Sequence, residues 1–450
     1  MQRDAIDFEN GEVAVLFRKL LLPTLLGTLS LSAVTAIDGI FVGHGVGAQG
    51  VAAVNIVVPV YQVMSGIGLM IGVGCSVVAS IHLSQQKPRI ARINATQALV
   101  GASLFTLLLC TCIWLFPEQT ASLLGASPTL MPQVVDYLKW IVPGFLFQMW
   151  GMIGLFIIRL DGSPQFAMWC NIIPSTLNAL LDWIFIFPLG MGVKGAAIAT
   201  SISITVGGIM ALSYLLFYAK ELRPVPLKNS RKSISLAFRN IGYQCRIGSS
   251  TLLGELTLAV LIYVGNLVFM HYLGDTGVGA FGIACYYMPF FFMVGNAIAQ
   301  SAQPIISYNY GIARWEHVVQ IRRLLLGTSV VLGMIVALLF IFIPDILVSL
   351  FVDVESESGQ IAVNGFPYFA TGIVFFILNV AIIGYYQSIE QIRRATLFVF
   401  LRGFAVLIPC FLLLPSLLDT KGIWLAMPLT ELITGMIIYC LWKCPRKSSN

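Results

Sequence analysis

Two aspartates within apolar stretches are the residues of this sequence best suited to chemistry. Asp38 lies in the first apolar stretch, and Asp182 lies in a later one. Asn178 precedes Asp182 by one helical turn, so the two side chains would share a helix face. Ala196 and Thr200 have the same spacing in the next apolar stretch. Two carboxylates, an amide oxygen, a hydroxyl and a backbone carbonyl are suitable oxygen ligands for a hard cation such as Na⁺.

The same residues allow two other interpretations. The carboxylates could share and exchange a proton, because two adjacent carboxylates do not ionise together readily. The polar side chains could also form a structural knot that holds three helices together. Spacing alone leaves these alternatives open.

The stretches that carry these residues are too apolar for a water-soluble domain. The chain has 450 residues, of which 58% are hydrophobic and 10% charged, whereas soluble domains carry about 25% charged residues. Continuous apolar runs of about 20 residues span a bilayer as helices, and they differ from the alternating pattern of a β-barrel. We therefore expect an all-α polytopic membrane protein with twelve spans. The expected spans are 16–42, 51–82, 93–116, 134–158, 166–188, 193–219, 241–272, 278–309, 319–344, 361–388, 394–414 and 421–442.

The basic residues predict the orientation of these spans. If the N-terminus is cytoplasmic, all 26 Lys and Arg residues lie on that side except Lys139, Lys194 and Lys421. The opposite loops are neutral or acidic, as at Glu355. By the positive-inside rule, both termini are expected in the cytoplasm, in a protein of the plasma (inner) membrane. The same rule accounts for the net charge of +6 without a nucleic-acid partner.

The chain also contains an internal repeat. Thr24-Leu25-Leu26-Gly27 recurs 227 residues later as Thr251-Leu252-Leu253-Gly254, and Lys194-Gly195 recurs as Lys421-Gly422. We expect an N-lobe at 1–219 with helices 1–6, a cytoplasmic linker at 220–240 and a C-lobe at 241–450 with helices 7–12. Because six spans is an even number, the lobes should be related by a pseudo-two-fold axis along the membrane normal, with a substrate cavity between them.

The repeat does not preserve the two aspartates. Gly265 and Pro409 stand at the positions that correspond to Asp38 and Asp182. A purely structural role would more naturally recur in both lobes. Pro23 precedes Asp38 on the first span, where it would allow a helix bend that the site could influence.

The other charged residues at membrane depth have less specific patterns. Glu255 is expected to line the substrate cavity, with or without a role in attracting cations. Glu431 lies midway along the last span, where packing, a cavity wall and a mechanistic role are all compatible with its position. Arg402 is expected to extend its charge to the cytoplasmic surface. Arg159 and Asp161 flank a tight turn and are expected to form a loop pair at the membrane surface.

Three motifs resemble those of the multidrug and toxic compound extrusion (MATE) family. Asp38-Gly39-Ile40-Phe41-Val42-Gly43, after Pro23, is similar to its opening signature. Asn178-Ala179-Leu180-Leu181-Asp182 and the stretch from Gly190 to Thr200 resemble its fifth and sixth helices. Gln303-Pro304-Ile305-Ile306-Ser307-Tyr308-Asn309-Tyr310-Gly311 resembles its eighth-helix motif.

The resemblance implies a monomeric antiporter that exports organic cations or amphipathic compounds by alternating access against Na⁺ or H⁺, without a further cofactor. In the DinF-like and archaeal branch, the matching residues form a cation site in the N-lobe. These are Asp38, Asn178, Asp182, Ala196 and Thr200, with Asp38, Asn178, Asp182 and Thr200 as the ligands if the ion is Na⁺. In the other branch, a seventh-helix Glu pairs with a tenth-helix Asp. Glu255 resembles that Glu, but no acid occurs between Ser358 and Ile389, which favours the first branch.

Two alternative functions fit this sequence less well. A flippase for lipid-linked precursors has a similar architecture but would place several bases in its cavity for anionic head groups, and here the buried charges are mainly acids. An intramembrane enzyme would need a nucleophile and base or metal ligands at membrane depth. The four histidines, His44, His82, His271 and His317, lie at span ends or in loops without ligand spacing. We therefore expect that the protein is not an enzyme.

Overall fold

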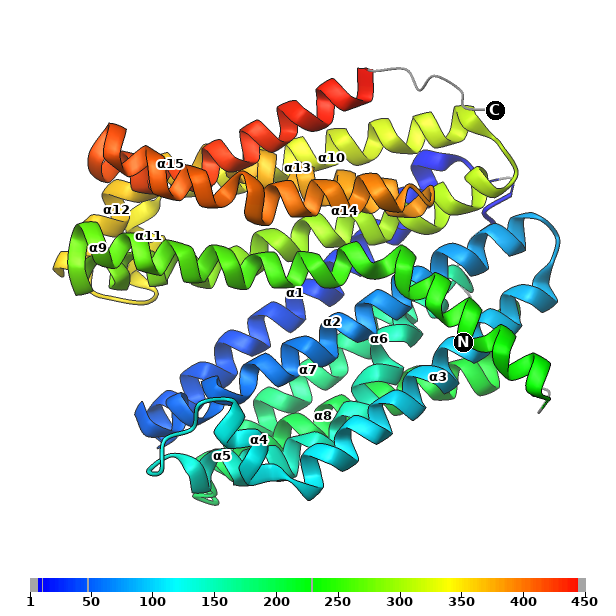
Figure 1. The fold of residues 1–450 in the computed structure, drawn as a ribbon, viewed down its shortest axis with the longest axis horizontal. Helices are drawn as coiled ribbons and strands as arrows, with labels where there is room; N and C mark the ends of the chain where they lie inside the picture. Colours follow the sequence, from blue (N-terminus) through cyan, green and yellow to red (C-terminus); the bar gives the residue numbers. More distant parts are fainter. Residues whose placement is uncertain (1–6, 10, 47, 228–229, 444–450) are drawn as a thin grey trace. The chain divides into compact units, whose positions relative to one another are not determined.

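The computed structural model describes residues 7–9, 11–46, 48–227 and 230–443, and every regular element in these ranges is helical (Figure 1). The first half contains α1 (Val13–Val46), α2 (Ala48–Ser84), α3 (Pro88–Leu115), α4 (Pro117–Leu123), α5 (Met131–Ile141), η1 (Val142–Gly144), α6 (Phe145–Leu160), α7 (Pro164–Ile186), α8 (Gly192–Ser213) and η2 (Tyr214–Tyr218). The second half contains α9 (Arg231–Gly311), α10 (Trp315–Phe342), α11 (Pro344–Ser349), α12 (Glu357–Ala370), α13 (Ile373–Ser388), α14 (Ile392–Phe400), η3 (Leu401–Ala405) and α15 (Leu407–Lys443).

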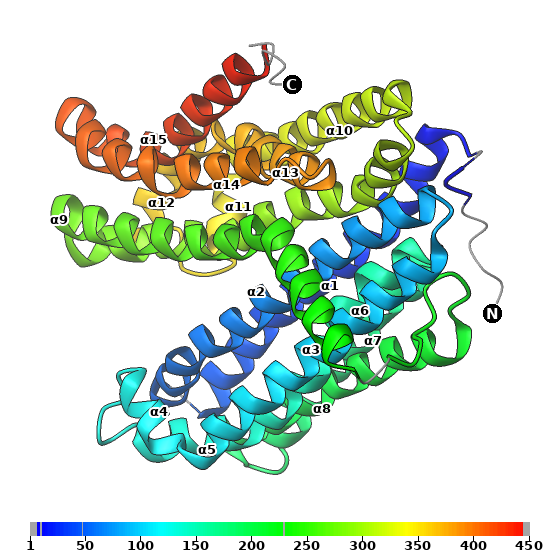
Figure 2. The same cartoon turned by 45° about the vertical axis from the view of Figure 1, so that its right-hand side comes forward.

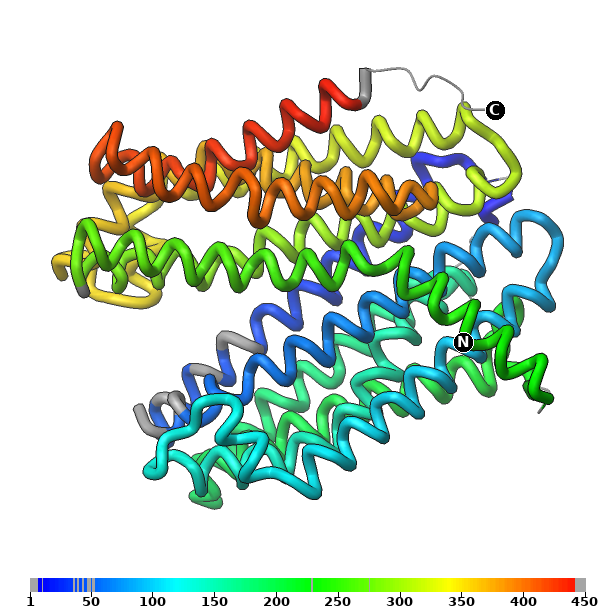
Figure 3. Tube along the Cα trace, in the orientation of Figure 1, coloured from blue at the N-terminus to red at the C-terminus, as the bar shows by residue number. Residues whose placement is uncertain are grey.

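The helices confirm the all-α polytopic architecture. In the described ranges, nine helices are long and apolar enough to cross a membrane, or ten if the bent pair α12 and α13 forms one span. α9 contains two of the expected spans, 241–272 and 278–309, and the backbone leaves helical geometry between them at Gly274. The expected span 394–414 runs through α14 and η3 into α15, and a similar break at Asp419 in α15 separates it from the span 421–442. Figure 3 traces this path as a tube from the blue α1 to the red end of α15. α7 is not among the nine, although an expected span covers it.

The helix boundaries have local causes. Proline is the first residue of α3, α4, α7 and α11, where its missing N–H would have no helical partner in any case. Gly190 and Gly192 both have φ of +59°, a conformation that favours glycine, and they allow the tight connection from α7 to α8. The two helices pack against each other as antiparallel neighbours, as this short connection predicts.

The chain divides into two compact units. Unit 1 comprises Met1–Leu252 and Gln303–Val318, and unit 2 comprises Leu253–Ala302 and Val319–Asn450. Unit 1 therefore combines the first sequence repeat with both ends of α9, whereas the middle of α9 belongs to unit 2.

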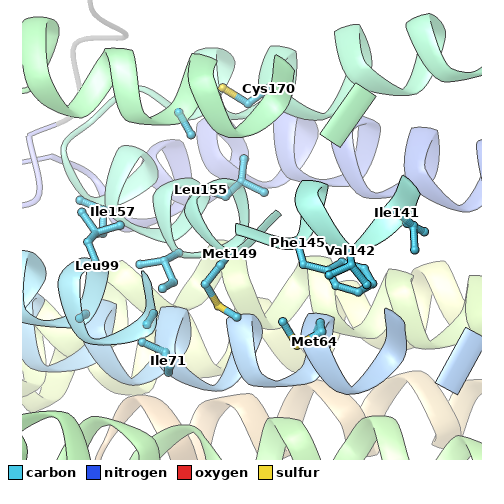
Figure 4. Packing of buried hydrophobic residues seen from close by; sticks show 14 of the residues in the cluster. Met64, Ile71, Leu99, Ile141, Val142, Phe145, Met149, Leu155, Ile157 and Cys170 are labelled. Atoms are coloured by element: carbon cyan, nitrogen blue, oxygen red, sulfur yellow. The ribbon is translucent and has the colours of Figure 1, made fainter. Parts of the chain in front are cut away.

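The core of unit 1 lies between helices that run side by side. α2 packs against α6, and α1 packs against α7, as Figures 1 and 2 show. Figure 4 shows Met64 and Ile71 of α2 facing Met149 of α6, with Phe145 and Leu99 nearby. These apolar contacts fix the relative positions of the helices that carry the polar residues.

Within unit 1, repeat-related positions of α2 and α9 meet. Ser76 donates a hydrogen bond to Oε1 of Gln303 at 2.9 Å, and the two residues are separated by 227 positions, the repeat displacement. Gly311, which corresponds to Ser84 in the repeat, lies against the Ser84 hydroxyl so closely that a methyl group would not fit. Repeat-related segments of α2 and α9 are therefore in direct contact within unit 1.

The core of unit 2 is aromatic. Phe291, Phe340, Phe366 and Phe369 form a chain of ring contacts with centroid separations of 5.0 to 6.4 Å. Trp424 of α15 joins this cluster through Phe366 and Phe369. Edge-to-face and tilted ring pairs of this kind add to the stabilisation from burial alone.

Candidate functional site

The two aspartates of unit 1 come together where α1 packs against α7. Asp182 is completely buried and Asp38 is partly buried. Their carboxyl groups are near enough to each other to interact directly. The structure thus brings together two residues that are 144 positions apart in the sequence.

Asn178 and Thr200 join this pair from α7 and α8. The amide of Asn178 faces the hydroxyl of Thr200, with 3.4 Å between Nδ2 and Oγ1. Ala196 is fully buried one turn before Thr200, so α8 offers no bulky side chain at this level. All five residues proposed from the sequence therefore lie on three helices that contact one another in unit 1.

The carboxylate oxygens have few partners. Among the described residues, Oδ1 of Asp38 and both carboxylate oxygens of Asp182 are buried and accept no hydrogen bond. No described Lys or Arg pairs with either aspartate. Because a buried charge without a partner is strongly unfavourable, the arrangement is chemically suited to hold a small cation or a proton.

Two tyrosines belong to the same site and were not anticipated. Tyr137 of α5 is buried beside Asp38, Asp182 and Thr200. Tyr61 of α2 lies near Asp38. Their phenol groups add polar atoms close to the carboxylates. Nothing in the local sequence distinguishes these tyrosines from the other thirteen among the 15 in the chain, since tyrosine is common in apolar helices.

Pro23 and Glu255 have less defined surroundings. Pro23 is buried inside α1, which continues as one helix from Val13 to Val46. Glu255 is partly buried on α9 in unit 2. No group of three or more His, Cys, Asp or Glu side chains in the described ranges could hold a metal ion.

Arg159 and Asp161 differ from the expectation of a surface loop pair, because both side chains are buried. The Asp161 carboxylate accepts hydrogen bonds from the backbone N–H groups of Glu221 and Leu222 at 2.8 and 3.0 Å. It also accepts one from the Tyr214 hydroxyl at 2.9 Å. Asp161 thus anchors the start of the linker segment to unit 1.

Arg402 also differs from its expected position. Its side chain is only 5% exposed, and it forms an ion pair with Glu431, which is 1% exposed. Asn379 donates from Nδ2 to Oε2 of Glu431 at 2.8 Å, and the Arg402 guanidinium lies 3.9 Å from the centroid of the Phe376 ring. The expectation that Arg402 reaches the cytoplasmic surface is therefore wrong. The ion pair offsets much of the cost of burying both charges, so the arginine need not reach water.

The local backbone favours this inward position. Arg402 lies in η3, a π-helical turn within an otherwise α-helical run, and such turns insert an extra residue that re-aims side chains. Gly403, the next residue, lies against Thr257 of α9 so closely that a methyl group would not fit. The Arg402–Glu431–Asn379 network is therefore enclosed by packed helices of unit 2.

The chain is similar in sequence to known export proteins. The sequence model of the family described as MatE matches two segments, residues 23–184 and 251–412. "Multidrug export protein MepA" of Staphylococcus aureus (strain MSSA476) is 24% identical over 445 residues, which cover 96% of this chain and 95% of the relative. The protein of the same name from Staphylococcus haemolyticus (strain JCSC1435) is 22% identical over 448 residues, which cover 96% and 93%.

The fold is similar to those of solved transporters. One, described as the "Outward-facing conformation of a multidrug resistance MATE family transporter of the MOP superfamily", has a TM-score of 0.89 at 19% sequence identity, over 97% of this chain and 96% of that chain. Another is a MOP superfamily transporter from Pyrococcus furiosus, with a TM-score of 0.85 at 20% identity, over 97% and 96% of the two chains. At these identities the likeness concerns the fold.

Proposed function

The chain belongs to the MatE family, and from this premise we propose that it is a cation-coupled antiporter that exports organic cations or amphipathic compounds by alternating access. The export proteins among its relatives indicate a multidrug efflux transporter. They also confirm the expectation that the chain is not an enzyme. Transporters of this family need no cofactor. We propose that the coupling ion is Na⁺ or H⁺.

The observation that carries the proposal is the pair of adjacent aspartates, neither of which has a positive partner in the described part of the chain. Three of their buried oxygens accept no hydrogen bond from the described residues. We assign the coupling site to Asp38, Asn178, Asp182, Ala196 and Thr200. If the ion is Na⁺, its ligands would be Asp38, Asn178, Asp182 and Thr200.

The energetics explain how this site could drive transport. An ionised carboxylate at membrane depth costs several kcal/mol, and a bound cation or proton removes much of that cost. Because Asp38 is on α1 and Asp182 is on α7, the bound ion would favour the arrangement in which the two helices approach. Loss of the ion would favour another arrangement of α1, for which Pro23 provides a bend. The ion then shifts a conformational equilibrium by its different affinity for the two states.

Efflux of a fluorescent drug from proteoliposomes, with the Na⁺ and pH gradients imposed separately, tests the coupling. We expect one of the two gradients to accelerate efflux and the other to have little effect. Efflux at the same rate with neither gradient would contradict cation coupling. The same experiment identifies the ion.

For the membrane arrangement, we propose an N-lobe at 1–219, a cytoplasmic linker at 220–240 and a C-lobe at 241–450, with an axis along the membrane normal. The two family-model matches, which have equal length and begin 228 residues apart, support a repeat of this size. The distribution of Lys and Arg supports cytoplasmic termini in the plasma membrane. The residues Gly47 and Lys228, which mark an outer loop and the linker in this scheme, lie outside the described residues.

Cysteine labelling in sealed cells checks the orientation. The exposed positions Arg223 and Glu355 are suitable sites, in a background where the exposed native Cys112 and Cys440 are replaced. A membrane-impermeant thiol reagent added outside should label the Glu355→Cys variant and not the Arg223→Cys variant. Labelling of Arg223→Cys from outside would reverse the proposed orientation.

Glu255 is the carboxylate that we propose for attraction of cationic substrates. The variant Glu255→Gln should export cationic drugs several-fold more slowly, because the charge that attracts them is lost. Export of a neutral amphipathic drug by the same variant is the internal control and should change little. If the variant binds both drugs normally but exports neither of them in response to the ion gradient, the coupling site lies at Glu255 instead.

A flippase for anionic lipid-linked precursors is less consistent with these residues. Such a protein would use buried bases to bind its head groups. In this structure the Arg402 guanidinium is already occupied by Glu431.

A further inference from the structure

A polar stripe continues along α7 from the candidate cation site. Asp182, Asn178, Ser175 and Asn171 follow one another at intervals of four, three and four residues, which places them on one helix face. Each of these side chains is at most 6% exposed. At a rise of about 1.5 Å per residue, the stripe extends about 16 Å from Asp182 toward the start of α7. It therefore spans about half of a hydrocarbon core that is about 30 Å thick.

α1 packs against α7 and contacts this stripe at both of its ends. A methyl group added to Gly27 would lie 3.2 Å from Nδ2 of Asn171, so the two helices are close at this level. Asp38 follows Gly27 by as many residues as Asp182 follows Asn171. The parallel helices thus remain in register between the two contacts. On the α1 side, Thr28 and Thr24 are buried at and below the level of Gly27.

Two hydroxyl groups, one on α1 and one in the α7 stripe, have no hydrogen-bond partner among the described residues. They are Oγ1 of Thr24, in a residue 2% exposed, and Oγ of Ser175, in a residue 4% exposed. A buried hydroxyl in a packed helix can be satisfied by a backbone carbonyl one turn earlier, and nearby hydroxyls do bond in this way. Thr28 donates to the Thr24 carbonyl at 2.9 Å, and Ser203 donates to the Ala199 carbonyl at 2.8 Å. Buried polar atoms without protein partners usually contact water or an ion.

The position that corresponds to Ser175 is occupied by a different kind of residue in the second repeat. Arg402 stands 227 residues after Ser175, and its guanidinium is paired with Glu431. The second repeat thus holds a fixed cation at the position where the first repeat presents a hydroxyl without a partner. The first repeat therefore has no built-in positive charge at the level where the second repeat holds an arginine.

We propose that the stripe of Asn178, Ser175, Asn171, Thr28 and Thr24 is the path along which the coupling cation leaves the Asp38–Asp182 site for the cytoplasm. Na⁺ would pass between amide and hydroxyl oxygens, and a proton would pass along hydroxyls and intervening water. The proposal rests on the proposed function and orientation, in which the start of α7 at Pro164 lies on the cytoplasmic side. It also gives a reason why α7 is not among the nine helices of the described ranges that are apolar enough to cross a membrane.

A pair of nearly isosteric substitutions tests the path. Ser175→Val and Ser175→Thr add a similar volume, but only the threonine keeps a hydroxyl. In proteoliposomes driven by the coupling gradient, we expect Ser175→Val to lower the turnover rate at least about tenfold, the effect of a 1.4 kcal/mol higher barrier. Ser175→Thr should retain most of the turnover. Cation affinity, measured as the Na⁺ or pH dependence of thermal stability in detergent, should stay the same in both variants because the site itself is intact.

The neighbouring residue provides the matched control. Thr176 is exposed on the other face of α7, and its hydroxyl donates to the Ile172 carbonyl at 2.9 Å. Thr176→Val should therefore keep normal turnover. An equal loss of turnover in Ser175→Val and Thr176→Val, or in Ser175→Val and Ser175→Thr, would overturn the path and indicate a packing effect.

The variant Asp38→Asn, measured in the same assay, separates this proposal from the proposed function. If Asp38→Asn loses gradient-driven efflux while Ser175→Val is normal, the coupling site stands and the path is wrong. If Asp38→Asn is also normal, the proposed coupling site itself is wrong, and the path is overturned with it.

Discussion

Replacing Asp38 or Asp182 with asparagine is expected to reduce gradient-driven efflux at least about tenfold, a change in coupling free energy of about 1.4 kcal/mol or more. Asparagine preserves the size and most of the hydrogen-bonding capacity of aspartate, but it carries no charge for a cation or proton to neutralise. The carboxyl groups interact directly, and no described basic side chain pairs with either. Each variant should therefore insert and fold but lose most of its response to the ion.

The measurement is drug efflux from proteoliposomes under the coupling gradient, with the amount of inserted protein determined for each variant. Asp136→Asn is the matched control, since Asp136 is an exposed aspartate on α5, one residue before Tyr137. That variant should transport normally. Near-normal efflux by Asp38→Asn or Asp182→Asn would exclude the coupling site and would favour the structural knot of three helices.

Removing the charge of Arg402 is expected to destabilise unit 2 by about 3–5 kcal/mol, the usual cost of breaking a buried ion pair at one partner. The variant Arg402→Met keeps much of the side-chain volume but leaves the Glu431 carboxylate, 1% exposed, without its positive partner. The remaining donor from Asn379 at 2.8 Å cannot neutralise that charge. The expected result is a lower midpoint of thermal unfolding in detergent.

The double variant Arg402→Met with Glu431→Gln distinguishes lost pairing from lost packing. It should recover most of the lost stability, because no isolated charge remains buried. Arg393→Met, which changes an exposed arginine of α14, serves as the control and should have little effect. A double variant that is as unstable as Arg402→Met would show that packing around the guanidinium, including the Phe376 ring, dominates.

The two pairs of charged residues show why the units are expected to differ in function. In unit 1 the acids Asp38 and Asp182 have no basic partner among the residues that the structure describes, so a mobile ion can complete the site. In unit 2 the acid Glu431 is already neutralised by Arg402. The other candidate there, Glu255, lacks a second acid to complete a pair, because no Asp or Glu occurs between Ser358 and Ile389. The ion pair cannot exchange with solution as a Na⁺ ion or a proton would, and we therefore place coupling in unit 1.

The sequence by itself determined the membrane class, the helices and part of the site. Hydropathy and helical spacing are local properties of the chain, so the apolar membrane helices and the shared face of Asn178 and Asp182 follow from consecutive residues. The connection through Gly190 and Gly192 likewise predicted the pairing of α7 with α8, and the repeat followed from direct comparison of the two halves. These inferences needed no knowledge of which distant segments meet.

Only the tertiary structure decided which charges are paired. Asp38 and Asp182 belong to helices far apart in the sequence, and their meeting depends on how α1 packs against α7. Arg402 was expected at the surface because its distance from a span end permits that position, but the π-helical turn of η3 directs it to Glu431. The position of Tyr137 beside the two aspartates could not be predicted from the local sequence either. The energy of a buried charge depends on partners from other helices, which spacing along one helix does not specify.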